Sequence, residues 1–159
     1  MSKPSIQNLM DEVTERVKST TTFADSGFQC FNLQDLTSWR ESGAALPMAG
    51  IAYEGSDIPD REIDTHKQSR GSRSVNTQSV KISVIIGVDY RGAGGPDTKV
   101  TALALLQEVR DVLHGYSNVN HRPWTFIGEQ PLDGDEEGVI FYGQLWATDI
   151  HLTGNHTAQ

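Results

Sequence analysis

The chain has 159 residues, 36% of them hydrophobic, and a formal net charge of −8 at pH 7. This length suits a single domain with a real core, and the acidic balance argues against a dedicated nucleic-acid binder, because Lys and Arg supply most phosphate affinity. The one cysteine, Cys30, excludes an intrachain disulfide and favours assembly in a reducing cytoplasm. We expect neither a secretory signal nor a membrane span, since no stretch approaches the roughly 18 apolar residues that a span requires.

The first part of the chain predicts one helix and two strands. Residues 5–20 carry apolar side chains at three- and four-residue spacings, which is typical of an amphipathic helix. The alternating segment 27–33 and the segment 46–54 favour strands, and Asp35 can cap a brief helical turn between them. Cys30 lies in the first of these strands, where we expect it to pack in the core.

The middle of the chain is polar. Residues 55–78 contain almost no large apolar side chain, so they predict an extended arm or a long hairpin tip that adds little to the core. A clear apolar alternation over 80–88 predicts another strand. A Gly-rich connection, 89–97, follows it.

The last part predicts a helix followed by an antiparallel pair of strands. A helix over 98–114 would place one apolar stripe toward the core, with Gly115 just past its end. The segments 122–128 and 138–152 favour strands, and Asp133 before Gly134 is typical of the tight turn that joins such a pair. The helix stripe comprises Val100, Leu103, Leu106, Val109, Val112 and Leu113.

Together these elements predict an α+β fold in one domain, residues 1–159, with a flexible tail at 153–159. We expect a mixed, mainly antiparallel sheet of about four to five strands packed against two main helices. The strand at 138–152 carries apolar side chains on both faces. One face therefore meets a helix, and the other requires a second cover.

The motifs point away from catalysis. The loop 91–98 lacks the Gly-Lys-Ser/Thr ending of a phosphate loop, and Asp97 would repel phosphate. The histidines show no metal-ligand spacing, and Cys30 has no matched histidine. We expect no catalytic residue, cofactor or metal, and keep a small-molecule or phosphate-binding enzyme domain built on 91–98 as the alternative of another class.

Three aromatic residues on the predicted strands allow two interpretations. Trp124, Tyr142 and Trp146 could form a stacking platform for bases. Packing in the core is the favoured interpretation, because the acidic balance disfavours nucleic acid.

Charge is unevenly distributed along the chain. No acid occurs between Thr65 and Val88, whereas the segment 133–137 holds four acids in five residues. Such patches can meet across a subunit interface, or they can simply be solvated loops.

The order of these parts resembles the tail terminator proteins of long-tailed bacteriophages, the Mu-like and lambda U-like group. The resemblance covers nearly the whole chain and is carried by the strand 47–55 (PMAGIAYEG), the helix end 105–115 (LLQEVRDVLHG) and the strand 142–149 (YGQLWATD). These are packing patterns and contain no catalytic fingerprint. The polar segment 55–77 is the feature that departs from the group.

The resemblance implies a structural protein without enzymatic activity. Tail terminators form a homohexameric ring that caps the tail tube, ends its polymerisation and docks the head-completion or neck protein; in contractile tails the last sheath ring is a further partner. DNA passes through the lumen without specific binding. The protein would be assembled in the host cytoplasm and located in the virion, at the tail or neck.

On this basis two sets of charged residues are hypothesised to lie at interfaces. The basic set is expected to contact a neighbouring subunit or tail ring, and it comprises Arg61, Lys67, Arg70 and Arg73. The acidic set is expected to face the lumen or a basic partner, and it comprises Asp133, Asp135, Glu136 and Glu137. A head-tail connector or neck stopper protein is the alternative within the same class.

Overall fold

The computed structural model describes residues 5–20, 24, 29–32, 47–57, 76–89, 97–132 and 138–152. Its elements are, in chain order, α1 (Ile6–Thr20), β1 (Gln29–Asn32), β2 (Met48–Asp57), β3 (Asn76–Asp89), α3 (Asp97–Leu113), β4 (Thr125–Leu132) and β5 (Val139–Leu152). The helical turn expected at Asp35, the turn at Asp133 and the tail 153–159 lie outside the described residues. Neither described helix is long and apolar enough to cross a membrane.

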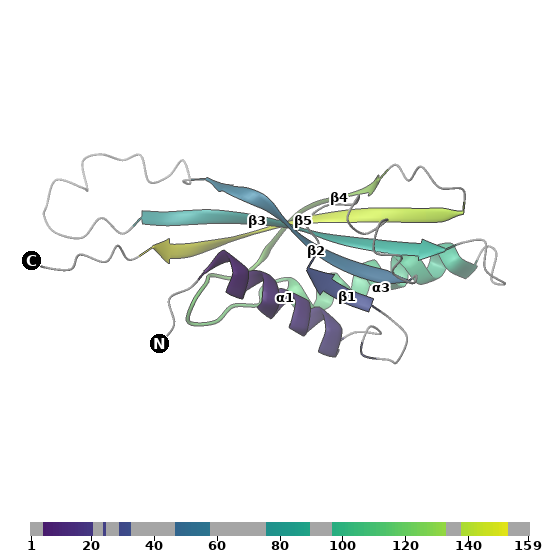
Figure 1. Cartoon of the computed structure of the whole chain (residues 1–159), viewed down its shortest axis with the longest axis horizontal. Coiled ribbons are helices and arrows are strands. Elements are labelled where there is room, and N and C mark those ends of the chain that lie inside the picture. Colours follow the sequence, from purple (N-terminus) through teal and green to yellow (C-terminus); the bar gives the residue numbers. More distant parts are fainter. Residues whose placement is uncertain are drawn as a thin grey trace, which may run out of the picture.

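The strands form one five-stranded sheet in the order β1-β2-β3-β5-β4. β1 pairs with β2 in parallel, and the remaining neighbours are antiparallel. α1 and α3 both lie on one side of this sheet (Figure 1). The predicted α+β fold with a mixed, mainly antiparallel sheet is therefore confirmed.

β3 and the end of β2 extend further than the sequence pattern predicts. β3 and β5 pair along their full length, from Asn76 opposite Leu152 to Asp89 opposite Val139. β2 continues past Glu54 to Asp57, across a register shift at which Gly55 adopts a φ of 115°. Both ends of the expected polar arm are thus strand, because residues 55–57 pair with β3 and residues 76–78 pair with β5, and this pairing outweighs their polar composition. Residues 58–75 lie outside the described part.

α1 begins at a side-chain cap. The Ser5 hydroxyl accepts a hydrogen bond from the amide of Asn8 at 3.1 Å, which satisfies one of the free donors of the first turn. The helix then buries one apolar stripe against the sheet and α3, as predicted. The buried residues of this stripe are Leu9, Met10, Val13 and Val17.

α3 buries a stripe that differs from the predicted one at Leu103. That side chain is 57% exposed, because it lies about 100° around the helix from Ala102, which faces the core. Gly115 has a φ of 76° two residues past the helix end, in agreement with its expected role as the residue that ends the helix. The buried stripe comprises Ala102, Leu105, Leu106, Val109 and Leu113.

The main core lies between the two helices and the sheet. Trp124 and Trp146 are fully buried in it, so the packing interpretation of these aromatics is confirmed. Cys30 is half-buried and packs against the same core, where its thiol lies 3.5 Å from the carbonyl oxygen of Thr14. Sheet residues in this core include Ala49, Ile51, Val80, Ile82, Val84, Ile86, Val88 and Ile150.

Candidate interaction surfaces

The second face of the sheet carries its own, smaller apolar cluster. It comprises the buried residues Met48, Ala52, Ile85, Val139 and Phe141, with Leu132 packed against them. Both described helices lie on the opposite face (Figure 1). The sequence pattern of β5 therefore predicted correctly that both faces of the sheet carry apolar groups. Neither described helix covers this second face.

A trough crosses this face over β2, β3, β5 and β4. Its apolar wall consists of Ala52, Ile85, Leu132 and Leu145, and its polar rim includes Glu54, Ser83 and Gln130. Tyr53, Gly128, Glu129 and Gly143 complete the lining. We call this hollow the open trough.

Two glycines lie in the floor of the open trough within strands, where glycine is unfavourable. A Cβ atom on Gly143 would come within 3.2 Å of Leu132 Cδ1, so packing inside the chain explains that glycine. A Cβ atom on Gly128 would meet nothing within 4 Å, and its φ does not lie in the left-handed region. Gly128 lies instead at the register shift of β4 that follows Phe126, and a glycine inside a strand often marks such a bulge.

The rim of the open trough carries one carboxylate without a cation. Glu54 Oε1 accepts a hydrogen bond of 2.6 Å from the Ser83 hydroxyl. Its neighbour along β2, Asp57, forms an ion pair with Lys81 at 3.2 Å. Within the described ranges, no corresponding ion pair is formed by Glu54.

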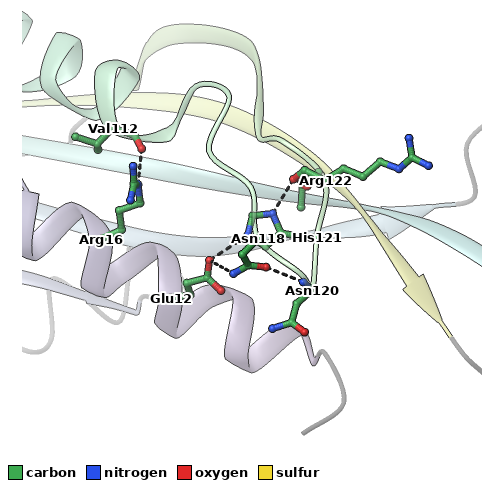
Figure 2. Close-up of polar contacts among 8 residues, drawn as sticks. Glu12, Arg16, Val112, Asn118, Asn120, His121 and Arg122 are labelled. Atoms are coloured by element: carbon green, nitrogen blue, oxygen red, sulfur yellow. Dashed lines mark hydrogen bonds and ion pairs between the residues drawn. The ribbon is translucent and has the colours of Figure 1, made fainter. Parts of the chain in front are cut away.

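A second candidate surface is the loop 114–124, which joins α3 to β4 and packs on α1. Figure 2 shows that Glu12 of α1 meets Asn118 and His121 of this loop. Glu12 Oε1 lies 3.0 Å from His121 Nε2 and 2.7 Å from Asn118 Nδ2. The Glu12 carboxylate thus contacts two side chains of the loop and attaches the loop to α1.

His121 is the buried centre of this network, with a side chain that is inaccessible to solvent. Its Nδ1 atom lies 2.6 Å from the carbonyl oxygen of Arg122, which also accepts a hydrogen bond from the Thr148 hydroxyl at 2.5 Å. Both ring nitrogens therefore face oxygen atoms, one of the Arg122 carbonyl and one of the Glu12 carboxylate. The ring also contacts Tyr116 and Trp124, with centroid separations of 5.6 Å in both pairs.

Arg16 ties the same region to the end of α3. Its Nε atom donates a hydrogen bond of 2.5 Å to the carbonyl oxygen of Val112, one of the carbonyls that a helix end leaves unpaired (Figure 2). The guanidinium carbon lies 3.7 Å from the centroid of the Tyr116 ring, a cation–π contact. A positive charge at this end also stabilises the helix dipole.

The network shifts the pKa of two of its members. Partial burial raises the pKa of Glu12, but hydrogen bonds from His121, Asn118 and Tyr116, together with the positive His121, outweigh burial and leave the pKa below its ordinary value. Burial raises the pKa of Tyr116, and its hydrogen bond to the Glu12 carboxylate and the charge of that group add to the effect. Glu12 is thus held as a carboxylate and Tyr116 as a neutral phenol.

The tip of the loop presents an isolated apolar side chain. Asn118 and His121 form an antiparallel bridge, and the amide of Asn120 donates to Asn118 Oδ1 at 2.8 Å. Val119, between them, is 94% exposed. A β-branched residue is unusual at a tight turn, where Gly, Asn, Asp and Ser dominate. The Arg122 side chain extends away from the network (Figure 2) and belongs to no ion pair within the described part of the chain.

A polar group is also built into the main core. The amide Nε2 of Gln144, fully buried, donates to the carbonyl oxygen of Leu106 at 2.9 Å and to Glu129 Oε1 at 2.8 Å. Gln144 Oε1 accepts a 3.3 Å hydrogen bond from Trp146 Nε1. Glu129 also pairs with Arg110 at 2.5 Å. These contacts connect α3, β4 and β5, and they have a structural role.

The edges of the sheet are protected against pairing with another strand. At one edge, β4 is interrupted by a register shift between Phe126 and Gly128 and contains Pro131, which has no amide hydrogen. At the other edge, β1 has only four residues. Extension of the sheet through these edges is therefore disfavoured, and the faces and loops remain for assembly.

The interface residues expected from charge all lie outside the described residues. This holds for Arg61, Lys67, Arg70 and Arg73 and for Asp133, Asp135, Glu136 and Glu137. Most of the loop 91–98 lies outside as well. Among the described residues, no group of three or more His, Cys, Asp or Glu side chains could hold a metal ion. Burial raises the pKa of the Cys30 thiol to about 12, which removes its nucleophilic form.

Comparison with known proteins identifies a shared fold. No family model matches the sequence, and no curated protein matches it. A solved chain from the virion of a native gene transfer agent particle is similar in structure, with a TM-score of 0.55 at 10% sequence identity. The similarity covers 88% of this chain and 92% of that chain. The two chains therefore share their fold over almost their whole lengths.

Proposed function

We propose that this chain is a structural protein of a phage-like virion, without enzymatic activity, that forms a ring at the end of a tail tube. In this role it is a tail terminator: it ends tube polymerisation and joins the tail to the head-completion or neck protein. Its partners are further copies of itself in a homohexamer, the tail tube protein and, in a contractile tail, the sheath. It is assembled in the host cytoplasm.

The observation that carries this proposal is the fold shared with a virion chain over 88% of the present sequence. A likeness at 10% identity concerns the fold, so the role is supported separately by the resemblance of three segments to tail terminators. These segments are 47–55, 105–115 and 142–149. Each contributes to a described element of the sheet or of α3.

Two features of the described residues support assembly through faces and loops. The protected edges of β1 and β4 disfavour open-ended strand pairing, which would generate fibres. The apolar second face and the exposed tip at Val119 offer surfaces that suit a closed assembly. A net charge of −8 suits a lumen through which DNA passes without binding, because negative walls repel phosphate.

The proposal also assigns interface roles to charged residues that lie outside the described part of the chain. The basic residues Arg61, Lys67, Arg70 and Arg73 contact a neighbouring subunit or tail ring. The acidic residues Asp133, Asp135, Glu136 and Glu137 face the lumen or a basic partner. Reversal of Arg70 and Arg73 to Glu then weakens ring formation, whereas reversal of Lys18, exposed on α1, leaves it unchanged.

The test is the mass of the purified protein over a concentration series, combined with negative-stain images and with tail tubes grown in its presence. We expect a closed ring of about six copies and tubes that stop elongating when it is added. A protein that stays monomeric and leaves tube growth unchanged would overturn the proposal. A ring that binds only the head-completion protein, and never a tube end, would instead indicate a neck stopper.

A further inference from the structure

We infer that neighbouring subunits of the proposed ring pack front to back, so that the exposed side of α3 in one copy covers the second face of the sheet in the next. This inference rests on the proposed ring and names the two surfaces that close it. In this contact, Leu103 of one copy enters the open trough of the next, and Asp111 of the first copy meets Arg122 of the second.

The second face of the sheet requires a cover that the described helices of the same chain do not provide. Both of those helices lie on the other face (Figure 1). The open trough has a volume of about 700 Å³, so a single inserted side chain would leave most of it empty. Sheet faces are covered by helices or by a second sheet. A helix, which brings several side chains at once, is therefore a suitable occupant.

A second hollow lies further along β5 on the same face. It is bordered by Arg122, and its lining includes Ser79, Thr125 and Ala147. We call it the Arg122 hollow. Ala147 and Leu145 of the open trough are two residues apart in β5, so their side chains point to the same face. The uncovered surface is thus a strip along β5 that is apolar near Leu145 and carries a cation at Arg122.

One side of α3 carries an exposed row of side chains. Leu103, Gln107 and Asp111 follow one another at intervals of four residues, so they lie one above the other along the helix. Leu103 is 57% exposed, and the two polar members are exposed as well. The Gln107 amide donates to Asp111 Oδ1 at 2.8 Å, which holds the carboxylate on this side. The row therefore begins with a large apolar side chain and ends with an anion.

The spacing of this row matches the spacing of the two hollows. Between Leu103 and Asp111 an α-helix rises about 12 Å. Leu145 lines the open trough and Asp149 lines the Arg122 hollow, and a strand advances about 13 Å between two such positions. If α3 of the next copy lies along β5, Leu103 is therefore in the trough when Asp111 reaches the Arg122 hollow.

The charges at the polar end of the contact are complementary. Among the described residues, neither Arg122 nor Asp111 forms an ion pair inside its own chain. Asp149, in the same hollow, takes part in interactions within its own chain. Arg122 is thus the group that can receive a carboxylate from outside. Pairing with Asp111 would give the contact specificity and fix its register.

The contact is also of the kind that a ring requires. A ring of more than two copies is closed by heterologous contacts, in which two different surfaces of the same chain meet. α3 and the second face lie on opposite sides of the sheet (Figure 1). Each copy therefore presents one surface to the copy before it and the other surface to the copy after it.

The first test alters the two apolar surfaces separately. Leu103→Asp puts a charge into the contact, and Ser83→Trp fills part of the trough that Ser83 lines. The control is Leu103→Met, which keeps an apolar side chain of similar volume. We expect the first two variants to lose the ring by mass photometry and the control to keep it. All three should melt close to the melting temperature of the wild type.

The second test exchanges the charges. Asp111→Arg and Arg122→Asp should each weaken the ring by about tenfold or more, because each leaves two like charges facing one another. The double variant reverses the pair and should restore the ring. The control is Glu15→Arg, which makes the same change of charge at an exposed position on α1 and should leave the ring unchanged. Restoration in the double variant would separate a direct contact from a defect in folding.

The third test links the two surfaces covalently. In a Leu103→Cys, Ser83→Cys double variant, oxidation should join successive copies into a ladder that ends at the closed ring on a non-reducing gel. The native Cys30 does not interfere, because burial raises its pKa to about 12. Each single variant has only one reactive cysteine, so it can give a dimer at most. Absence of a ladder in the double variant would overturn the contact even if Leu103→Asp failed to fold.

These outcomes separate the two proposals. If the wild-type protein forms a ring and caps tubes but Leu103→Asp and Ser83→Trp do so equally well, the contact through α3 is wrong and the tail-terminator function stands. A Leu103→Asp variant that keeps the ring and loses only tube capping would likewise overturn the contact between subunits. If the wild-type protein neither forms a ring nor responds to tube ends, the proposed function fails and the inference fails with it.

Discussion

The buried His121 ring and the Glu12 carboxylate are in contact across 109 positions of the chain, with 3.0 Å between His121 Nε2 and Glu12 Oε1. This pair attaches the loop 114–124 to α1, and the loop in turn positions Trp124 at the start of β4. The amide of Trp124 donates to the carbonyl oxygen of Tyr116 at 3.0 Å, which closes the loop on itself. The stability of α1 and the conformation of the loop are thus linked.

Removal of the Glu12 carboxylate should destabilise the protein. In Glu12→Ala, the buried His121 ring and the exposed Asn118 amide lose their shared partner, and a buried polar group left unsatisfied costs about 1–3 kcal/mol. We expect a loss of this size in the free energy of unfolding, measured by urea titration. Glu15→Ala, one turn along the same helix and exposed, is the control and should change stability by less than about 0.5 kcal/mol. Equal effects of the two variants would show that the pair contributes nothing.

The same carboxylate should produce a defined acid sensitivity. Because the pKa of Glu12 is lower in the folded state than its ordinary value of 4.5, the folded state binds this proton more weakly than the unfolded state does. The stabilisation is complete above the ordinary pKa and is lost as the pH falls through the lowered value. The unfolding free energies of wild type and Glu12→Gln should therefore converge from about pH 6 to about pH 3. A constant difference over that range would contradict the assignment.

Cys30 should be inert in the folded protein. Its pKa of about 12, raised by burial and by the nearby Glu15 against the opposing charge of Lys18, leaves only about one thiolate in ten thousand at about pH 8. We expect negligible reaction with an aromatic disulfide reagent until denaturant is added. Val119→Cys, at an exposed position, provides the matched fast-reacting site. Rapid labelling of native wild-type protein would show that Cys30 is not held in the core.

The elements of this fold were predictable because their signals are local. The apolar stripe of residues 5–20 and the alternation of 80–88 and 138–152 each reside in a single segment, and the helix end at Gly115 follows from its tolerance of positive φ. Leu103 was misassigned because its spacing fits two neighbouring stripes of the helix. Which stripe is buried is decided by the position of the sheet.

The candidate surfaces were not predictable in the same way. The Glu12–His121 contact joins residues 109 positions apart, and no local pattern marks either residue. The open trough depends on the register that brings Gly128 opposite Leu145 and Gly143 opposite Ile85. Glycine within a strand was the one available signal, since it often marks a bulge or a close approach. The predicted charged interface residues remain predictions, because they lie outside the described part.

Gln144 provides the last prediction, because its amide serves three partners at the boundary between α3 and the sheet. Gln144→Leu keeps the side-chain volume but removes the donor to Leu106 and Glu129 and the acceptor for Trp146 Nε1. Glu129 would keep its pairing with Arg110, whereas the Trp146 donor would be buried without a partner. We expect a loss of about 1–3 kcal/mol in unfolding free energy, measured by urea titration with Trp fluorescence.

The matched control is Gln130→Leu, which makes the same exchange at an exposed position on β4. It should change the unfolding free energy by less than about 0.5 kcal/mol. A fully apolar replacement can equal or exceed a buried polar group in stability when every partner is removed together. A stable Gln144→Leu variant would therefore mean that the Trp146 indole finds another acceptor, and the buried amide would then have no structural role of its own.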